Sequence, residues 1–158
     1  MYRWVEHTSE LELEIEAADE HEVFRDGMRA LAELLEPQED AAPAAGGGEH
    51  DARTRAAGDQ EGSPTPPVGR LQRRTVEATA RDRPALLAAW LEELLFLAES
   101  SGLIPVEMEQ VALDSQRIAA TVAGRTGWPR PLVKAVTYHN LAFERTKQGY
   151  RGRVVFDV

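Results

Sequence analysis

The end of the chain and a segment near its beginning carry the residues with the most specific chemistry. Asp157 directly precedes the last residue, Val158, so a side-chain carboxylate and an α-carboxylate lie close together. Such anions repel each other unless water or a cation neutralises them, and more so if Glu10 joins them. All-oxygen ligand sets of this kind suit hard cations such as Ca²⁺ and Mg²⁺. On the residues alone, a frayed and hydrated C-terminus is the simpler interpretation.

Two further polar segments could carry chemistry. His7 stands with hydroxyl and carboxyl side chains in the segment 6–10, which we interpret as a solvent-exposed turn. Lys134 begins the segment 134–140, where polar groups interrupt an apolar strand. Alternation along that strand places His139 on the same face as Leu141 and Phe143. A histidine among such neighbours is more often structural than a ligand.

The elements that must position these residues start with a β-hairpin. The sequence Glu-Leu-Glu-Leu-Glu-Ile-Glu over residues 10–16 alternates acidic and apolar side chains. This period of two predicts a strand with one face buried in an antiparallel sheet. Residues 2–5 are aromatic and β-branched enough to form its partner strand, and residues 7–9 would connect the two.

Two helices are predicted from capping residues and apolar spacing. Asp19 is a candidate N-cap, and apolar residues recur at helical spacing until Pro37, which predicts a helix over 20–35. Asp82 is the candidate N-cap of a second helix, in which Leu, Trp and Ala side chains form a broad apolar stripe ending before Gly102. That stripe is typical of a core helix lying on a sheet.

The remaining pattern predicts strands over about 71–80, 104–114, 117–125, 133–145 and 150–158. The resulting fold class is α+β, a two-layer sandwich with a mostly antiparallel sheet packed against two main helices. Residues 37–69 contain seven Ala, six Gly and five Pro, too little apolar surface to offset the entropy of ordering. We therefore expect one domain over 1–158 that carries a flexible insertion at about 37–69.

Composition excludes several functional classes. The chain has 27 acidic and 18 basic residues and a formal net charge of −9, so broad adhesion to nucleic acid or anionic lipid is not expected. It has no cysteine, which excludes disulfides, thiolate zinc sites and iron–sulfur clusters. No secretory signal, membrane-spanning run or phosphate-binding loop is present, so we expect a cytoplasmic protein with no membrane partner. The residues alone identify no turnover reaction.

Several segments together resemble the archease family. Residues 4–10, Trp-Val-Glu-His-Thr-Ser-Glu, are similar to that family's Glu-His-Thr-Ala-Asp element, and residues 86–96 to its Trp-Leu-Asn-Glu-Leu-Leu-Tyr helix. Residues 134–139 match its Lys-Ala-Val-Thr-Tyr-His strand letter for letter. The last six residues resemble its apolar strand, which ends in Asp and an aliphatic residue.

The resemblance implies a metal site, reported for the family as calcium. The implied ligands are Glu10, Asp157 and the carboxylate of Val158, with Mg²⁺ or Mn²⁺ as alternative ions. His7, Lys134 and His139 are implied as supporting or partner-facing residues. Position 10 is Glu where the family usually has Asp, so its carboxylate lies one methylene further from the backbone.

The resemblance also implies a role. Family members assist the RtcB-type RNA-splicing ligase, by promoting guanylylation of the ligase and restoring multiple turnover in tRNA splicing and RNA repair. The chain would then be an accessory activator rather than an enzyme, and would meet RNA only through the ligase. A chaperone-like interaction module that uses the acidic face of residues 10–16 is an alternative, and a metal-dependent hydrolase is a further one.

Overall fold

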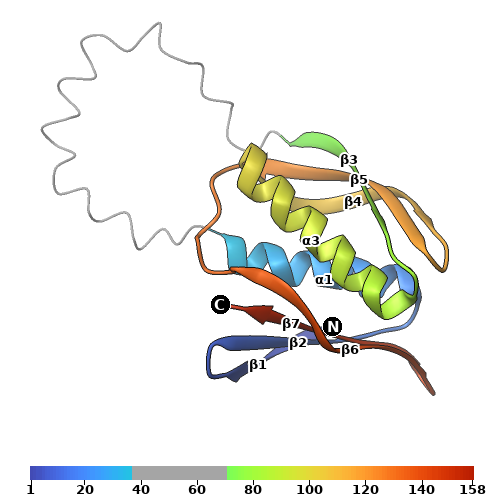
Figure 1. The fold of residues 1–158 in the computed structure, drawn as a ribbon. Helices are drawn as coiled ribbons and strands as arrows, with labels where there is room; N and C mark the ends of the chain where they lie inside the picture. The colour runs from blue at the N-terminus through green and yellow to red at the C-terminus, as the bar shows by residue number, and fades with distance from the viewer. Residues whose placement is uncertain (37–70) are drawn as a thin grey trace, which may run out of the picture.

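The structure, a computed structural model, describes residues 1–36 and 71–158 (Figure 1). The insertion predicted at 37–69 lies outside the described residues. The strands are β1 (Tyr2–His7), β2 (Glu10–Ala17), β3 (Gln72–Thr79), β4 (Leu103–Leu113), β5 (Arg117–Thr126), β6 (Ala135–Thr146) and β7 (Gly149–Asp157). The helices are α1 (Glu20–Leu35) and α3 (Arg83–Ser101).

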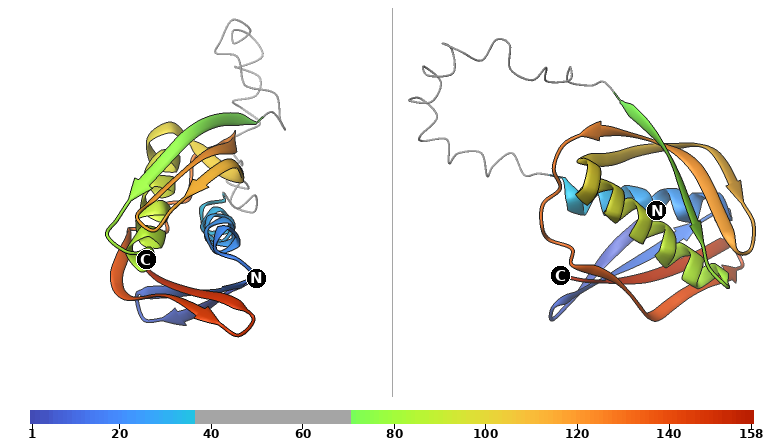
Figure 2. Two further views of the ribbon diagram at one scale, coloured as in Figure 1. Left: turned by 90° about the vertical axis from the view of Figure 1, so that its right-hand side faces the viewer. Right: turned by 45° about the horizontal axis from the view of Figure 1, so that its top comes forward.

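The strands form two antiparallel sheets with the two helices between them (Figures 1 and 2). One sheet has the order β1-β2-β7-β6 and the other β3-β5-β4. The predicted α+β class with antiparallel strands is confirmed. The sequence pattern predicted a two-layer sandwich in which one sheet packs against the two helices. The structure instead divides the strands between two sheets. The apolar surface of α3 is broad enough to pack against both sheets, since the helix contacts β3 of one sheet and β6 of the other.

The caps expected from the sequence define the beginnings of both helices. The Asp19 carboxylate accepts a hydrogen bond from the Glu22 backbone N–H at 2.9 Å, and Asp82 accepts one from the Ala85 N–H at 2.9 Å. At the other end of α3, Gly102 takes the left-handed conformation, with φ of 64°, that glycine adopts without strain. Both helices therefore begin where local hydrogen bonding dictates.

The centre of the molecule lies between the helices and the sheets. Trp90 of α3 is fully buried, and its indole N–H donates a hydrogen bond to the carbonyl oxygen of Phe24 in α1 at 3.3 Å. Leu13 of β2 and Phe156 of β7 are also fully buried and belong to the same core. The apolar residues of the β2 alternation therefore face the helices, and its acidic residues face outward.

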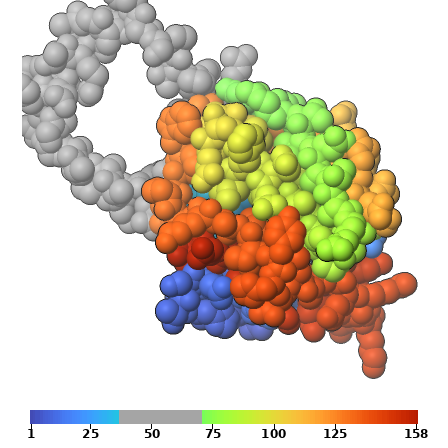
Figure 3. Space-filling view, viewed as in Figure 1, coloured from blue at the N-terminus to red at the C-terminus, as the bar shows by residue number. Residues whose placement is uncertain are grey.

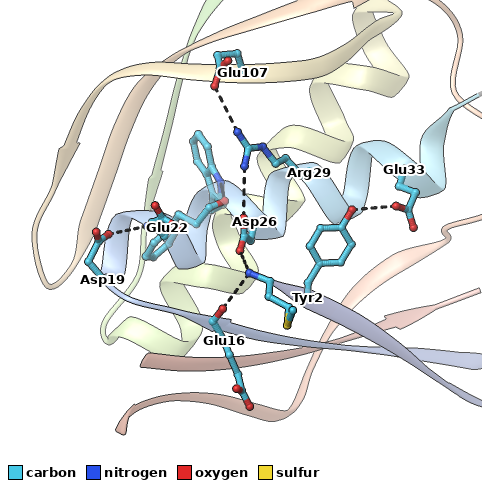
Figure 4. Close-up of polar contacts among 11 residues, drawn as sticks. Tyr2, Glu16, Asp19, Glu22, Asp26, Arg29, Glu33 and Glu107 are labelled. Carbon is cyan, nitrogen blue, oxygen red and sulfur yellow. Dashed lines mark hydrogen bonds and ion pairs between the residues drawn. The ribbon is translucent and has the colours of Figure 1, made fainter. Parts of the chain in front are cut away.

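A buried carboxylate joins α1 to the beginning of the chain (Figure 4). Asp26 is 5% exposed and lies 2.5 Å from the Met1 ammonium group, which also donates to the carbonyl oxygen of Glu16. Arg29 lies between Asp26 at 3.7 Å and Glu107 of β4 at 3.8 Å. These ion pairs connect α1 to the residue before β1 of one sheet and to β4 of the other.

No helix among the described residues has the length and apolarity that crossing a lipid bilayer requires.

Candidate metal centre

The pairing of β2 with β7 brings the two predicted acidic ligands together. Glu10 is the cross-strand partner of Asp157. Directly paired residues of antiparallel strands project on the same face of the sheet, with Cβ atoms about 4.5–5.5 Å apart. The backbone N–H of Val158 donates to the carbonyl oxygen of Ser9 at 3.1 Å, so the last residue lies beside the turn that joins β1 to β2.

The register that creates this pair is fixed by burial. Leu13 pairs with Val154 and Leu11 with Phe156, so these four apolar side chains face the helices. A slip of one residue would move the apolar set to the outer face, which burial of the core forbids. Ser9, with φ of 64°, allows the tight connection that starts β2 at residue 10. The acidic pair thus follows from the hydrophobic pattern of its neighbours.

The outer carboxylates of β2 have different electrostatic partners along the strand. Glu12 lies 3.7 Å from Arg153, Glu16 lies 3.4 Å from Arg151, and Glu14 forms an ion pair with Arg3. In residues 1–36 and 71–158, neither Glu10 nor Asp157 has an arginine or lysine partner within 4 Å. Among the described residues, no arginine or lysine side chain therefore compensates the negative charge at this end of the sheet.

His139 lies at this end of the sheet, although the sequence pattern placed it on an apolar face. Its Nε2 is 3.4 Å from Glu10 Oε2, and the imidazole is 56% exposed. The predicted alternation is wrong here, because the pairing of β6 with β7 is interrupted between Thr137 and Ala142. Phe143 therefore packs on Phe24 in the core, whereas His139 reaches the outer face.

Tyr138 holds the same irregular segment of β6 to helix α3. Its hydroxyl donates a hydrogen bond to Glu92 Oε1 at 2.5 Å. Burial, this hydrogen bond and the negative charge of Glu92 raise the pKa of Tyr138 to about 12. The phenol therefore stays protonated and can donate this bond throughout the neutral range. The sequence analysis did not predict this contact, because no sequence pattern indicates which turn of α3 lies next to β6.

Lys134 and His7, the two remaining predicted residues, lie near the candidate centre but make different contacts there. The backbone N–H of Lys134 donates to the Asp157 carbonyl oxygen at 2.7 Å, while the lysine as a whole is exposed. His7 is the cross-strand partner of Glu10, and its Nε2 lies 4.0 Å from Glu12 Oε1. His7 belongs to β1, whose observed range extends two residues beyond the predicted strand.

The donors suit a hard cation that keeps part of its water shell. In the part of the chain that the structure describes, no three His, Asp or Glu side chains gather closely enough to hold a metal. The two side-chain carboxylates would need the α-carboxylate of Val158 and water to complete an oxygen set. Figure 3 shows the last residues, in dark red, reaching the surface between the blue N-terminal strands and the orange segment before β6. Solvent can therefore reach the centre.

Comparison with known proteins gives one family throughout. The model of the Archease protein family matches residues 63–158. A protein archease from Methanosarcina mazei is 25% identical over 166 residues, which cover 99% of this chain and 95% of that protein. A protein archease from Methanosarcina acetivorans is 33% identical over 94 residues, which cover 54% of this chain and 64% of that protein.

Two solved structures share the fold. The solution structure of Methanobacterium thermoautotrophicum protein 1598 superposes with a TM-score of 0.62 at 20% identity, covering 99% of this chain and 98% of that one. The crystal structure of an archease described as a possible chaperone, from Thermotoga maritima, gives a TM-score of 0.56 at 16% identity. That match covers all of this chain and 98% of the other.

Proposed function

This chain belongs to the archease family, and from that premise we propose that it is a non-catalytic accessory protein that activates an RNA-splicing ligase of the RtcB type in the cytoplasm. The observation that carries the proposal is the cross-strand pair of Glu10 and Asp157 at the surface, without an arginine or lysine partner among the described residues. Carboxylates in this arrangement suit a cation-mediated contact with a partner.

In the proposed role, Glu10, Asp157 and the carboxylate of Val158 hold a divalent cation. Calcium is the ion that the family resemblance implies, with Mg²⁺ or Mn²⁺ as alternatives. The cation would supply positive charge next to the nucleotide phosphates or the metal-bearing pocket of the ligase. The contribution of this chain is to present the acidic pair on a rigid sheet, where the register of β2 and β7 sets its position.

The test is a guanylylation and multiple-turnover assay with the matching ligase, with and without this chain and with added chelator. Asp157→Ala should abolish the stimulation, since it removes one of the paired carboxylates. Glu99→Ala is the matched control, because Glu99 is an exposed carboxylate near the C-terminal end of helix α3. Circular dichroism and the unfolding midpoint should show that both variants keep the fold. Full stimulation by Asp157→Ala would contradict the proposal.

A chaperone-like interaction module is the second candidate, favoured by the description of the Thermotoga maritima neighbour as a possible chaperone. A chaperone would suppress aggregation of unrelated unfolded clients and act near stoichiometric amounts. A ligase activator would instead accelerate turnover of one enzyme at substoichiometric amounts. A hydrolase, the third alternative, would consume nucleotide with no ligase present.

A further inference from the structure

We propose that the free edge of strand β3 is a self-complementary interface, through which two copies of this chain pair antiparallel and join their β3-β5-β4 sheets into one continuous sheet. β3 is the outer strand of that sheet, so one side of its backbone has no strand partner among the described residues. Glu10 and Asp157 belong to the other sheet, and the interface is therefore separate from the candidate metal centre.

The backbone groups of β3 that face outward belong to its odd-numbered residues. Ala80, directly after the strand, donates its N–H to the carbonyl oxygen of Gln116 at 3.0 Å, so the even-numbered residues turn their backbone groups toward β5. The Arg74 guanidinium donates to the Arg73 carbonyl oxygen at 3.1 Å, which is possible because that oxygen faces away from β5. The outward-facing residues are Arg73, Thr75, Glu77 and Thr79. Such a row of N–H and C=O groups is a template for another strand.

The side chains at these positions select one two-fold register. If Thr75 lies opposite its own copy, Arg73 lies opposite the partner subunit's Glu77, and the two-fold axis produces this pair twice. Unlike charges that are directly opposite stabilise an antiparallel pair, and like charges destabilise it. An axis one residue earlier would place two copies of Arg74 opposite each other. Charge therefore favours the axis at Thr75.

The same pairing extends ion pairs that each chain already has. Arg73 lies 3.0 Å from Glu109 of β4, and Glu77 forms an ion pair with Arg117 of β5. All four side chains lie near the surface, with exposed fractions between 39% and 58%. Across the two-fold axis they would form a row in which negative and positive charges alternate. Neither chain would have to give up an ion pair of its own.

The inner side of the edge also suits a second copy. Figure 3 shows β3, in green, next to α3, in yellow-green to yellow, on one face of the molecule. A hollow of about 300 Å³ beside the edge is lined in part by Ala78, Ala89 and Glu92. In the register centred on Thr75, the partner subunit's Arg74 lies opposite Val76, whose side chain faces the helices. An arginine would thus approach the acidic surface of α3.

The other sheet edges among the described strands are less suited to self-pairing. β4 contains Pro105 and two register shifts, and the ladder of β6 is interrupted between Thr137 and Ala142. Proline and bulges of this kind block pairing with another chain. β1 is regular, but the face that carries Arg3 has no carboxylate on this strand to lie opposite it. Charge complementarity therefore points to β3 and to a second copy of this chain.

The experiment is sedimentation equilibrium of the full chain over the micromolar to millimolar range, which should show a monomer–dimer equilibrium. Arg73→Glu should raise the dimer Kd at least about fivefold, because it turns attraction into repulsion at both copies of the pair. The double variant Arg73→Glu with Glu77→Arg should restore dimerisation, although both ion pairs within the chain stay broken. Arg3→Glu is the matched control, because Arg3 is an exposed arginine on another edge strand.

A cysteine variant tests the register directly, since the chain has no cysteine of its own. Thr75→Cys places two thiols across the axis, on Cα atoms about 5.5 Å apart, which a disulfide can bridge. Mild oxidation should therefore give a covalent dimer. Thr79→Cys is the control, because Thr79 is exposed on the same face of β3 but lies four residues from the axis.

Circular dichroism should show that every variant keeps the fold. The inference is overturned if the wild type is monomeric over the whole range, if Arg73→Glu leaves Kd unchanged, if the double variant does not recover, or if Thr79→Cys cross-links as readily as Thr75→Cys. Ligase stimulation is measured separately on the same variants. Stimulation by a chain that is always monomeric would leave the proposed function standing, and a dimer that does not stimulate would leave only the interface.

Discussion

Tyr138 shows how one residue connects the candidate centre to the rest of the fold. Its phenol lies between the irregular segment of β6 and Glu92 of α3, and burial together with the carboxylate raises its pKa to about 12. Tyr2 is similar, because burial and the hydrogen bond that it donates to Glu33 of α1 also raise its pKa to about 12. Only the protonated form of each phenol can donate its hydrogen bond.

The sign of the resulting pH dependence follows from these raised values. A folded-state pKa above the unfolded value contributes stability that is full below about pH 10 and is lost as the pH rises through about 12. Absorbance at 295 nm should therefore show two of the three tyrosines ionising near pH 12. Tyr138→Phe should remove one of these late steps. An unchanged late amplitude in Tyr138→Phe would refute the assignment.

At the scale of elements, capping determines where α3 begins. The Asp82 side chain accepts the Ala85 N–H, one of the four N–H groups that a helix leaves without an internal partner. Asp82→Ala should lower the free energy of unfolding by about 0.5–2 kcal/mol, measured by denaturant titration. Glu93→Ala, an exposed substitution within the same helix, should change it by less than about 0.5 kcal/mol. Equal effects of the two variants would contradict the role of the cap.

The shape of the edge strand β6 also depends on a local feature, an interruption of its pairing with β7. Residues 138–141 interrupt the ladder with β7, and a bulge at a sheet edge also discourages pairing with another chain. In this molecule the interruption additionally turns His139 toward Glu10. One irregular segment thus shapes both the edge of the sheet and the surroundings of the candidate centre.

At the scale of the whole molecule, α3 joins the two sheets into one core. Its buried side chains belong to the core, and the helix packs against β3 and β4 of one sheet and against β6 and β7 of the other. Trp90 is the largest of these side chains and is fully buried. The two sheets therefore share their main apolar contact and should unfold together.

Removing that contact tests the shared core. Trp90→Ala should cost about 3–5 kcal/mol, because it deletes a large buried side chain and leaves a cavity. Denaturant unfolding followed by far-UV and near-UV circular dichroism should still show one coincident transition, shifted to lower denaturant. Phe96→Ala is the control, since Phe96 of the same helix is 66% exposed. Two separate transitions would mean that the sheets are independently stable.

The sequence by itself determined the elements, because their signals are local. The helix predicted over 20–35 coincides with Glu20–Leu35, since an N-cap at one end and a proline after the other specify both boundaries. The alternation over residues 10–16 determined which face of β2 is buried. The resemblance to the archease family is also a property of sequence segments. The metal, the ligase partner and the insertion at 37–69 remain predictions.

Only the tertiary structure decided which distant residues meet. The pairing of Glu10 with Asp157 joins strands from the two ends of the chain, and their register depends on apolar side chains that fit one core. The division into two sheets depends on α3 being apolar around most of its circumference, which a pattern of single strands does not contain. The position of His139 depends on an interrupted ladder, which a strict period of two cannot predict.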